Sequence, residues 1–346
     1  MISIDLVSGD QELHTRAKIS IVIPTYNSER TLPQCLDSIK DQDYPRDQIE
    51  IIIADGGSTD RTLEIARKHT VKVLSNPRRT GEAGKSVGAK AAESEIIAFI
   101  DSDNILPSRD WLKMMVEPFD DLEIAAAEPL YYTYRRGDPL ITRYCALMGM
   151  NDILCLYLGN YDRYNKLTGR WTDMNVTTTN RNNYLLVELN ERNIPTIGAN
   201  GFLVRADALR STELGPYLFD IDLVYQLVIA GWRKYAKVKI GIIHLFANSV
   251  QLYAKKTRRR ITDYLNYQRL GVRKYPWSSV RSVGLPKFLL YTLTIAPLLM
   301  TSLRGYRKLP DRAWLFHPLA CWLTLLTYTI NYLVTPRSRD SVTEEH

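Results

Sequence analysis

The sequence predicts an α/β fold in which helices cover both faces of a mostly parallel sheet. Three observations lead to this prediction. Short, nearly continuous apolar runs recur in the N-terminal third, stretches with helical periodicity separate them, and polar residues follow the ends of the runs. An apolar run covered on both faces is typical of a parallel strand, and strand–helix alternation is typical of βαβ units.

Four apolar runs are predicted strands, and three periodic stretches between them are predicted helices. The strands are expected at 19–24, 49–55, 71–74 and 95–101, and the helices at 31–39, 59–69 and 84–92. Asp60 is suited to cap the second helix, because it follows a Gly-Gly-Ser-Thr run and precedes a 3.6-residue pattern. Ligands of such sheets bind at the carboxyl ends of the strands.

Three of the predicted strands end in groups capable of chemistry. Their C-terminal continuations are Thr25-Tyr26-Asn27-Ser28-Glu29, Asp55-Gly56-Gly57-Ser58-Thr59-Asp60 and Asp101-Ser102-Asp103-Asn104. Each continuation alone has the composition of an ordinary turn. Three of them on neighbouring strands of one sheet favour a binding site.

The residue types at these strand ends suit a nucleoside diphosphate. Asp101 and Asp103 lie two residues apart, so one divalent cation can engage both, and hard oxygen ligands favour Mg²⁺ or Mn²⁺. Asp55, followed by two glycines, is suited to accept a hydrogen bond from a base N–H while the backbone comes close. The ring of Tyr26 offers a face on which a base can stack.

Four ordered blocks of the sequence resemble family 2 glycosyltransferases with the GT-A fold. The donor half of that family is matched by IVIPTYNSERTLPQCLDSI, IIIADGGSTDRT and IIAFIDSDN. IGANGFLVR at 197–205 resembles the family's acceptor-side glycine segment. FDIDL at 219–223, followed by AGW at 230–232 and IIH at 242–244, resembles its E-D-x-D-L … G … H block. The resemblance covers residues 18 to 246 and implies a Rossmann-like GT-A domain.

The resemblance also implies a role for individual residues. It assigns donor binding to Pro24, Thr25, Tyr26, Glu29, Asp55, Lys85 and Ser102. It assigns the metal to Asp101 and Asp103, with Asp103 the more direct ligand and His244 a third. Asp220 would be the general base that takes the proton of the acceptor. The family's usual Glu is Phe219 here, so Asp222 stays open as the alternative base.

Two further motifs are weighed against this interpretation. GEAGKS at 81–86 is similar to a P-loop, but Arg79 stands where that motif needs glycine. The Q-x-x-R-W motif of processive polysaccharide synthases is not present, which favours transfer of a single sugar. The four cysteines are scattered and have no metal-ligand spacing, which indicates buried thiols in a reducing compartment.

The C-terminal region combines positive charge with two apolar runs. Residues 255–339 contain sixteen Lys and Arg against two acidic residues, Asp263 and Asp311, which gives this region a net charge of +14. Because the whole chain has a net charge of +7, the remaining residues together have a net charge of −7. The runs at 288–303 and 313–334 contain no charged residue. About 20 apolar residues span a bilayer, so membrane association is expected. The alternatives are a spanning hairpin, a re-entrant or in-plane pair, and two soluble helices packed under the catalytic domain.

These observations together predict six segments. They are an N-terminal extension at 1–17, a nucleotide-sugar-binding half at 18–127, an acceptor-side half at 128–250, a basic interfacial segment at 251–284, two hydrophobic membrane-associated helices at 285–336, and a tail at 337–346. No apolar h-region of a signal peptide is visible at the N-terminus, so the catalytic part is expected at the cytoplasmic face of the cell membrane.

The predicted function is metal-dependent, inverting transfer of one sugar. The donor would be a UDP- or GDP-sugar, the cofactor Mn²⁺ or Mg²⁺, and the acceptor a polyprenyl phosphate or a lipid-linked glycan. The alternative enzyme is a sugar-phosphate nucleotidyltransferase. The alternative from another class is a basic nucleic-acid-binding module, but the basic residues lie among long apolar runs, so no nucleic-acid partner is expected.

Overall fold

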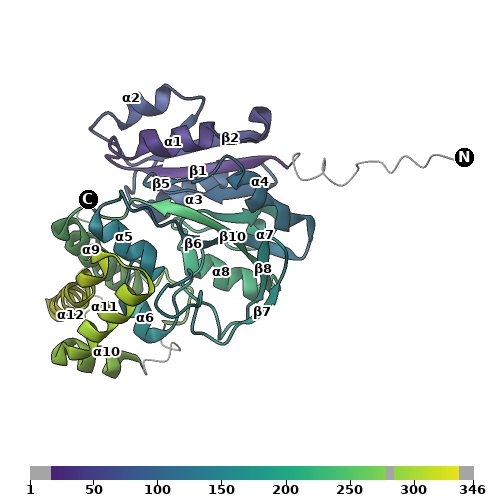
Figure 1. Cartoon of the computed structure of the whole chain (residues 1–346). Coiled ribbons are helices and arrows are strands. Elements are labelled where there is room, and N and C mark those ends of the chain that lie inside the picture. The colour runs from purple at the N-terminus through teal and green to yellow at the C-terminus, as the bar shows by residue number, and fades with distance from the viewer. Residues whose placement is uncertain (1–16, 278–283, 335–346) are drawn as a thin grey trace, which may run out of the picture. The chain divides into compact units, whose positions relative to one another are not determined.

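The structure is a computed structural model that describes residues 17–277 and 284–334, so most of the predicted N-terminal extension and the whole predicted tail lie outside the described residues. The chain divides into two compact units (Figure 1). Unit 1 contains the described residues up to Thr133 together with Asn175–His244. Unit 2 contains Tyr134–Met174 and the described residues from Leu245 onward. Each unit therefore combines two separate parts of the sequence, unlike the linear order of segments that the sequence suggests.

Unit 1 is built on a ten-stranded sheet with the order β3-β2-β1-β4-β9-β6-β10-β8-β7, and β5 pairs with β10. The strands are β1 Ile19–Thr25, β2 Ile49–Asp55, β3 Lys72–Ser75, β4 Ile96–Phe99, β5 Asn104–Ile105, β6 Ile124–Tyr132, β7 Thr177–Asn180, β8 Tyr184–Glu188, β9 Phe202–Arg205 and β10 Lys234–His244. The four predicted strands are confirmed as β1 to β4, with ends shifted by one or two residues.

The sheet is mixed, which corrects the prediction of a mostly parallel sheet. β3, β2, β1 and β4 are parallel neighbours, and every residue of β1 is buried, as expected for a strand covered on both faces. β9 pairs antiparallel with both β4 and β6, and β8 pairs antiparallel with β10. Antiparallel neighbours need no crossover helix, and the sequence before β9 has none of the strand–helix alternation that predicts the parallel half.

The helices of unit 1 are α1 Leu32–Lys40, α2 Thr62–Arg67, α3 Gly81–Ala91, α4 Trp111–Val116, α7 Ala206–Arg210 and α8 Asp220–Ile229. Two glycines let α3 approach β1 closely. A Cβ at Gly88 would lie 2.2 Å from Val22 Cγ1, and a Cβ at Gly84 would lie 2.8 Å from Pro24 Cβ. The spacing of four residues places both glycines on one helix face. The glycines of the GEAGKSVG run therefore serve helix–strand packing.

Unit 2 is helical. It contains α5 Leu140–Met148, α6 Leu154–Leu158, α9 Val250–Arg269, α10 Gly284–Thr294, α11 Ala296–Lys308 and α12 His317–Val334. One apolar core joins its two sequence segments, since Leu147 and Tyr161 pack in the same cluster as Leu298 and Trp314. Consequently α9 to α12 share a core with residues 134–174 and do not form a separate appendage.

The two predicted hydrophobic helices differ from each other in the structure. The run at 288–303 is broken at Ile295, where α10 and α11 meet at 94°. Pro297 lies in the first turn of α11, where its ring and missing N–H prevent continuation of a preceding helix. Within the described residues, Arg312–Val334 is a single helix long and apolar enough to cross a membrane, and 39% of its most apolar window is buried.

Candidate functional site

The loops that follow β1 and β2 are joined through Asp55. This carboxylate accepts hydrogen bonds from Thr25 Oγ1 (2.8 Å) and Ser58 Oγ (2.6 Å) on Oδ1, and from the backbone N–H groups of Gly57 and Ser58 (both 2.9 Å) on Oδ2. Asp55 is 5% exposed. These four bonds use the usual acceptor positions of a carboxylate. Asp55 thus holds the glycine loop in place, a role that the sequence did not reveal.

Tyr26 and Arg79 both lie against this loop at Gly56. The ring of Tyr26 is 49% exposed, and a Cβ at Gly56 would lie 3.3 Å from its Cδ2 and 3.2 Å from the Cα of Arg79. Arg79 has a positive φ of 57°, and its Nε would lie 3.9 Å from a Cβ at Gly57. Arg79 is therefore a cation beside the glycine loop, and the sequence did not single it out as a site residue.

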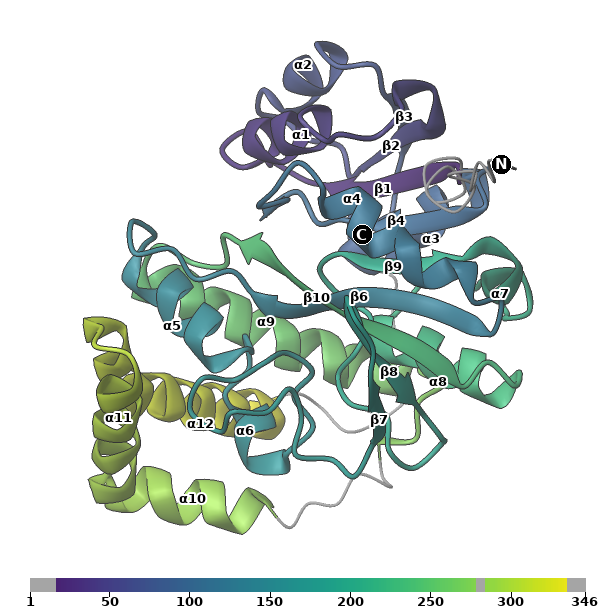
Figure 2. The same ribbon diagram turned by 45° about the vertical axis from the view of Figure 1, so that its right-hand side comes forward.

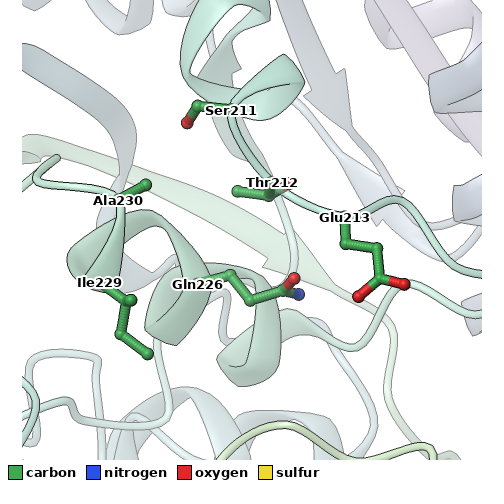
Figure 3. Close-up of a pocket in the computed structure, with 6 residues that line it drawn as sticks. All are labelled: Ser211, Thr212, Glu213, Gln226, Ile229 and Ala230. Carbon is green, nitrogen blue, oxygen red and sulfur yellow. The ribbon is translucent and has the colours of Figure 1, made fainter.

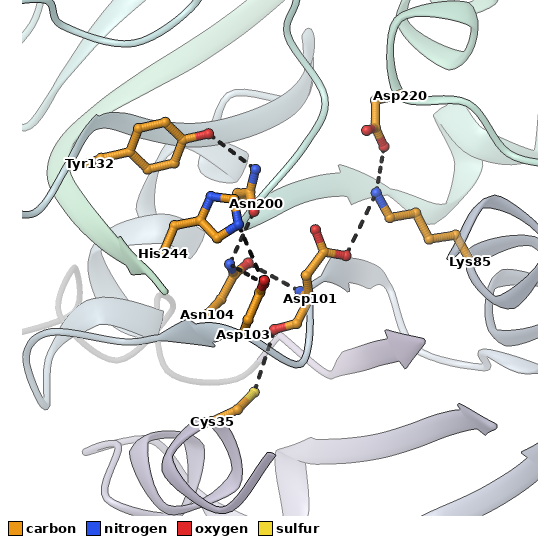
Figure 4. A network of polar contacts seen from close by, with 9 residues as sticks. All are labelled: Cys35, Lys85, Asp101, Asp103, Asn104, Tyr132, Asn200, Asp220 and His244. Atoms are coloured by element: carbon orange, nitrogen blue, oxygen red, sulfur yellow. Dashed lines mark hydrogen bonds and ion pairs between the residues drawn. The ribbon is translucent and has the colours of Figure 1, made fainter. Parts of the chain in front are cut away.

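The Asp101-Ser102-Asp103 turn after β4 rests on a buried pair of amides (Figure 4). The backbone N–H of Asp101 donates to Asn104 Oδ1 (3.1 Å), and Asn104 Nδ2 donates to Asn200 Oδ1 (3.0 Å). Asn200 Nδ2 in turn donates to the hydroxyl of Tyr132 (3.1 Å). The sequence placed Asn104 in the polar continuation after the predicted strand at 95–101, but it did not reveal that Asn104 supports the turn through Asn200 and Tyr132.

His244 reaches the same turn through strand pairing. β5 pairs antiparallel with β10, and this register sets His244 opposite Asn104. Consequently His244 Nε2 lies 3.4 Å from Asp103 Oδ1, a contact that a dashed line marks in Figure 4. The ring of Tyr132 packs beside the imidazole with a centroid distance of 5.6 Å. The structure therefore brings together two of the three predicted metal ligands.

The third predicted ligand, Asp101, faces a lysine. Lys85 Nζ lies 3.9 Å from Asp101 Oδ1 and donates a 2.6 Å hydrogen bond to Asp220 Oδ1. Burial opposes the charge on Lys85, whose side chain is 7% exposed, but the two carboxylates hold its pKa above its ordinary value. Desolvation raises the pKa of Asp220 to about 6, although Lys85 opposes that rise. Lys85 thus links the turn after β4 to the first residue of α8.

Asp220 and Asp222 have different surroundings. Asp220 is the first residue of α8 and its side chain is 31% exposed, whereas Asp222 is 2% exposed. Gly198, with a φ of 120°, lies directly against Asp220, because a Cβ there would come within 2.8 Å of the Asp220 carbonyl oxygen. Of the two candidate bases, Asp220 is the one in contact with Lys85 beside Asp101.

The donor set at the turn fits a divalent cation in part. Within residues 17–277 and 284–334, no group of three or more His, Cys, Asp and Glu side chains is arranged to hold a metal. The predicted three-residue set is therefore not assembled, because the Asp101 carboxylate pairs with Lys85. Asp103 supplies a carboxylate, a ligand that suits Mg²⁺ or Mn²⁺, and His244 places an imidazole beside it.

The other predicted donor-binding residues lie at the same edge of the sheet. Pro24 is buried in β1, and Ser102 Oγ is 3.0 Å from Ser28 Oγ. Glu29 Oε2 accepts from the backbone N–H of Arg61 (3.2 Å) and pairs with its guanidinium. The side chain of Glu29 therefore fixes the loop before α2 to the loop after β1.

A separate hollow of about 310 Å³ opens on unit 1 (Figure 3). It is lined by Ser211, Thr212, Glu213, Gln226, Ile229 and Ala230. It borders the C-terminal end of α8, whereas Asp220 is at the N-terminal end. None of the predicted site residues lines it.

Comparisons with known proteins agree with the resemblance seen in the sequence. Residues 20–209, more than half of the chain, match the family "Glycosyl transferase family 2". The chain is 38% identical over 95 residues to poly(ribitol-phosphate) beta-N-acetylglucosaminyltransferase TarS of Staphylococcus aureus. This match covers 26% of this chain and 17% of that protein. It is 34% identical over 112 residues to a Methanococcus voltae protein, dolichyl N-acetyl-alpha-D-glucosaminyl phosphate 3-beta-D-2,3-diacetamido-2,3-dideoxy-beta-D-glucuronosyltransferase. This match covers 30% of this chain and 35% of that protein.

Both matches span well under half of the relatives' length. Among solved structures, the mannosyltransferase PcManGT from Pyrobaculum calidifontis, in complex with GDP-Man and Mn²⁺, superposes with a TM-score of 0.51 at 16% identity. That superposition covers 91% of this chain and 87% of the other. At this identity the similarity establishes a shared fold.

Proposed function

The chain belongs to glycosyl transferase family 2, and on this premise we propose that it transfers one sugar from a nucleotide-sugar to an acceptor oxygen, with inversion at the anomeric carbon. The observation that carries the proposal is the Lys85 bridge. It sets an accessible carboxylate, Asp220, beside the Asp101-Ser102-Asp103 turn. One side of this site is suited to a leaving diphosphate and the other to an attacking hydroxyl or phosphate.

The donor would bind at the loops after β1 and β2. Tyr26 offers an exposed ring for stacking on the base, and the loop held by Asp55 lets the backbone approach the nucleoside. Arg79 adds a positive charge next to this loop. The GDP-Man bound to the Pyrobaculum enzyme supports a nucleoside diphosphate sugar, and we propose a UDP- or GDP-sugar for this chain.

A divalent cation, Mn²⁺ or Mg²⁺, would be held by Asp103 and His244 next to Asp101. When bound, it would neutralise the charge that develops on the leaving diphosphate. The Mn²⁺ of the Pyrobaculum complex supports this assignment.

Asp220 would act as the general base. A carboxyl with a pKa of about 6 is largely ionised at neutral pH and still basic enough to share a proton in the transition state. With a hydroxyl acceptor, the acceptor oxygen bonds to the anomeric carbon as the bond to the diphosphate breaks, and the hydroxyl proton passes to Asp220; a phosphate acceptor that still carries a proton would lose it to Asp220 in the same way. Lys85 stabilises the ionised form of Asp220 before that step.

We further propose that the acceptor is membrane-associated, either a polyprenyl phosphate or a lipid-linked glycan, and that the protein acts at the cytoplasmic face of the membrane. The exposed leucines of α10 to α12 and the local charge of +14 support a membrane location. The Methanococcus relative, which is named as a transferase acting on dolichyl N-acetyl-alpha-D-glucosaminyl phosphate, supports a lipid-linked acceptor.

The proposal is tested by supplying purified full-length protein with UDP- and GDP-sugars, Mn²⁺ and polyprenyl phosphate or extracted lipid-linked glycans. We expect release of the nucleoside diphosphate together with a glycosylated lipid whose anomeric configuration, read by NMR, is opposite to that of the donor. Retention of configuration would refute the single-displacement mechanism. Release of pyrophosphate from a nucleoside triphosphate and a sugar phosphate would instead identify a nucleotidyltransferase.

A further inference from the structure

Exposed aliphatic side chains are concentrated on α10, α11 and α12 of unit 2. On α10 and α11 these side chains include Leu289, Leu290, Leu293, Leu299, Met300 and Leu303, which are between 38% and 62% exposed. Leu319, Leu326 and Ile330 continue the set on α12. We call this set the leucine surface. Exposed aliphatic residues in unit 1, such as Leu122 and Ile229, are few and lie in separate elements. A concentrated apolar surface of this kind marks an interaction site.

From this surface we propose that unit 2 inserts in the plane of one leaflet of a bilayer, and that none of the helices α9 to α12 crosses the membrane. The inference deepens the proposed membrane location. It does not depend on the proposed chemistry, because it rests on the helices of unit 2 alone.

The bent pair α10–α11 cannot span a bilayer in this conformation. The two helices have 11 and 13 residues, about 16 and 20 Å at 1.5 Å per residue, against a hydrocarbon core of about 30 Å. The angle between them is 94°, and Figure 2 shows α11 turning sharply away from the end of α10. One side of each helix is already used, since Phe288 on α10 and Leu298 on α11 are buried in the core of unit 2. Only the opposite side is available to lipid.

α12 is long enough to span, but polar contacts tie it to the rest of unit 2. His317 Nδ1 is 2.8 Å from the Tyr144 hydroxyl, and Tyr328 donates a hydrogen bond to Asp152. Near the other end of α12, Thr262 Oγ1 of α9 donates to Asn331 Oδ1 (3.3 Å). The attachments at residues 317 and 331 are about 21 Å apart along the helix.

Because α12 packs along α9, a spanning α12 would take α9 with it into the hydrocarbon. α9 carries six basic residues, Lys255, Lys256, Arg258, Arg259, Arg260 and Arg269. Burying that many cations in lipid is strongly unfavourable. This cost is avoided when α9 stays in the headgroup region or above it. In that arrangement α12 contacts the acyl chains only through its exposed side chains, Leu319, Leu326 and Ile330.

The charges around the leucine surface specify the kind of leaflet. Lys287 is exposed in the first turn of α10, and Arg304, Arg307 and Lys308 are exposed in the last turns of α11. Cations that flank an apolar surface are typical of helices lying in an anionic interface. We therefore infer an anionic leaflet as the occupant of this surface, in preference to a second copy of the chain.

The first test compares binding of full-length variants to vesicles of phosphatidylcholine with one part in three of phosphatidylglycerol. The variant Leu290→Gln/Leu299→Gln/Leu303→Gln should show a partition coefficient at least about a hundredfold lower than the unaltered protein. The matched control Leu122→Gln/Ile229→Gln removes aliphatic side chains that are equally exposed in unit 1, and it should bind like the unaltered protein. The inference would be overturned if both variants bound the vesicles equally well. It would also be overturned if the triple variant kept its vesicle binding and lost only self-association in solution.

The second test determines topology with a membrane-impermeant maleimide added outside vesicles to which the protein is bound. In an in-plane arrangement, Arg259→Cys on α9, Arg307→Cys at the end of α11 and Arg337→Cys, three positions beyond Val334, should each be labelled to the same extent before and after detergent. Labelling of Arg307→Cys or Arg337→Cys only after detergent would show that α11 or α12 reaches the far side and would overturn the inference. Donor binding is measured on the same samples, so a failure of the proposed chemistry is recognised separately.

Discussion

Replacing Lys85 with methionine should move the acid limb of the pH–rate profile upward. Methionine keeps the length of the buried side chain but removes the charge that lies 2.6 Å from Asp220 Oδ1. Asp220 must be ionised to accept the acceptor's proton, so in the unaltered protein the rate should fall as the pH drops below about 6. Loss of the lysine charge leaves desolvation and the negative charge of Asp101 unopposed, and both raise the pKa of Asp220 further.

The size of the shift follows from the geometry. An opposite charge within 4–6 Å typically changes a carboxyl pKa by about 1 to 3 units. With the smallest of these shifts the pKa of Asp220 moves from about 6 to ~7. The ionised fraction at pH 6.5 then falls from roughly three quarters to roughly one quarter, and the larger shifts leave almost none.

The assay is kcat as a function of pH at saturating donor, for Lys85→Met and for Lys90→Met. Lys90 lies on the same helix but is exposed and bonds the carbonyl of Gly215, so its variant should keep the original profile. The Lys85→Met rate should recover towards that of the unaltered protein above about pH 8.5. An unshifted acid limb with a raised KM for the donor would refute the reasoning and assign Lys85 to the diphosphate instead.

Three further predictions test the rest of the site and the helix that supports it. Asp220→Asn should abolish transfer while donor binding by calorimetry stays intact, whereas Asp222→Asn should keep transfer; the reverse pattern would make Asp222 the base. Asp103→Asn should weaken donor binding in the presence of Mn²⁺, and excess EDTA should do the same to the unaltered protein, so full activity in EDTA would rule out the metal role. Gly88→Ala should cost about 1–3 kcal/mol of unfolding free energy, because its Cβ would lie 2.2 Å from a β1 side chain. Gly81→Ala, with nothing within 4 Å, should leave the melting temperature nearly unchanged, and equal effects would contradict the packing argument.

The sequence by itself determined the elements whose signals are local. The apolar runs of β1, β2 and β4 can be read directly because a strand covered on both faces needs an uninterrupted apolar stretch. Asp60 was predicted to cap α2; the N-cap position is Arg61, and Asp60, one residue earlier, accepts from the N–H of Thr62 (2.9 Å) in the first turn. The polar residues after these strands gather at one edge because parallel strands all end there.

The tertiary structure alone decided which of those polar residues touch. Lys85 and Asp220 are 135 positions apart, and no periodicity connects them; the packing of α3 on the sheet places the lysine at the start of α8. His244 meets Asp103 only because β5 pairs with β10. Likewise, residues 134–174 share a core with α9 to α12, although 75 residues separate Met174 from Val250. Such contacts depend on long-range packing, whose free energy comes from burying surfaces that are distant in the sequence. A local sequence pattern does not indicate which distant surface it will pack against.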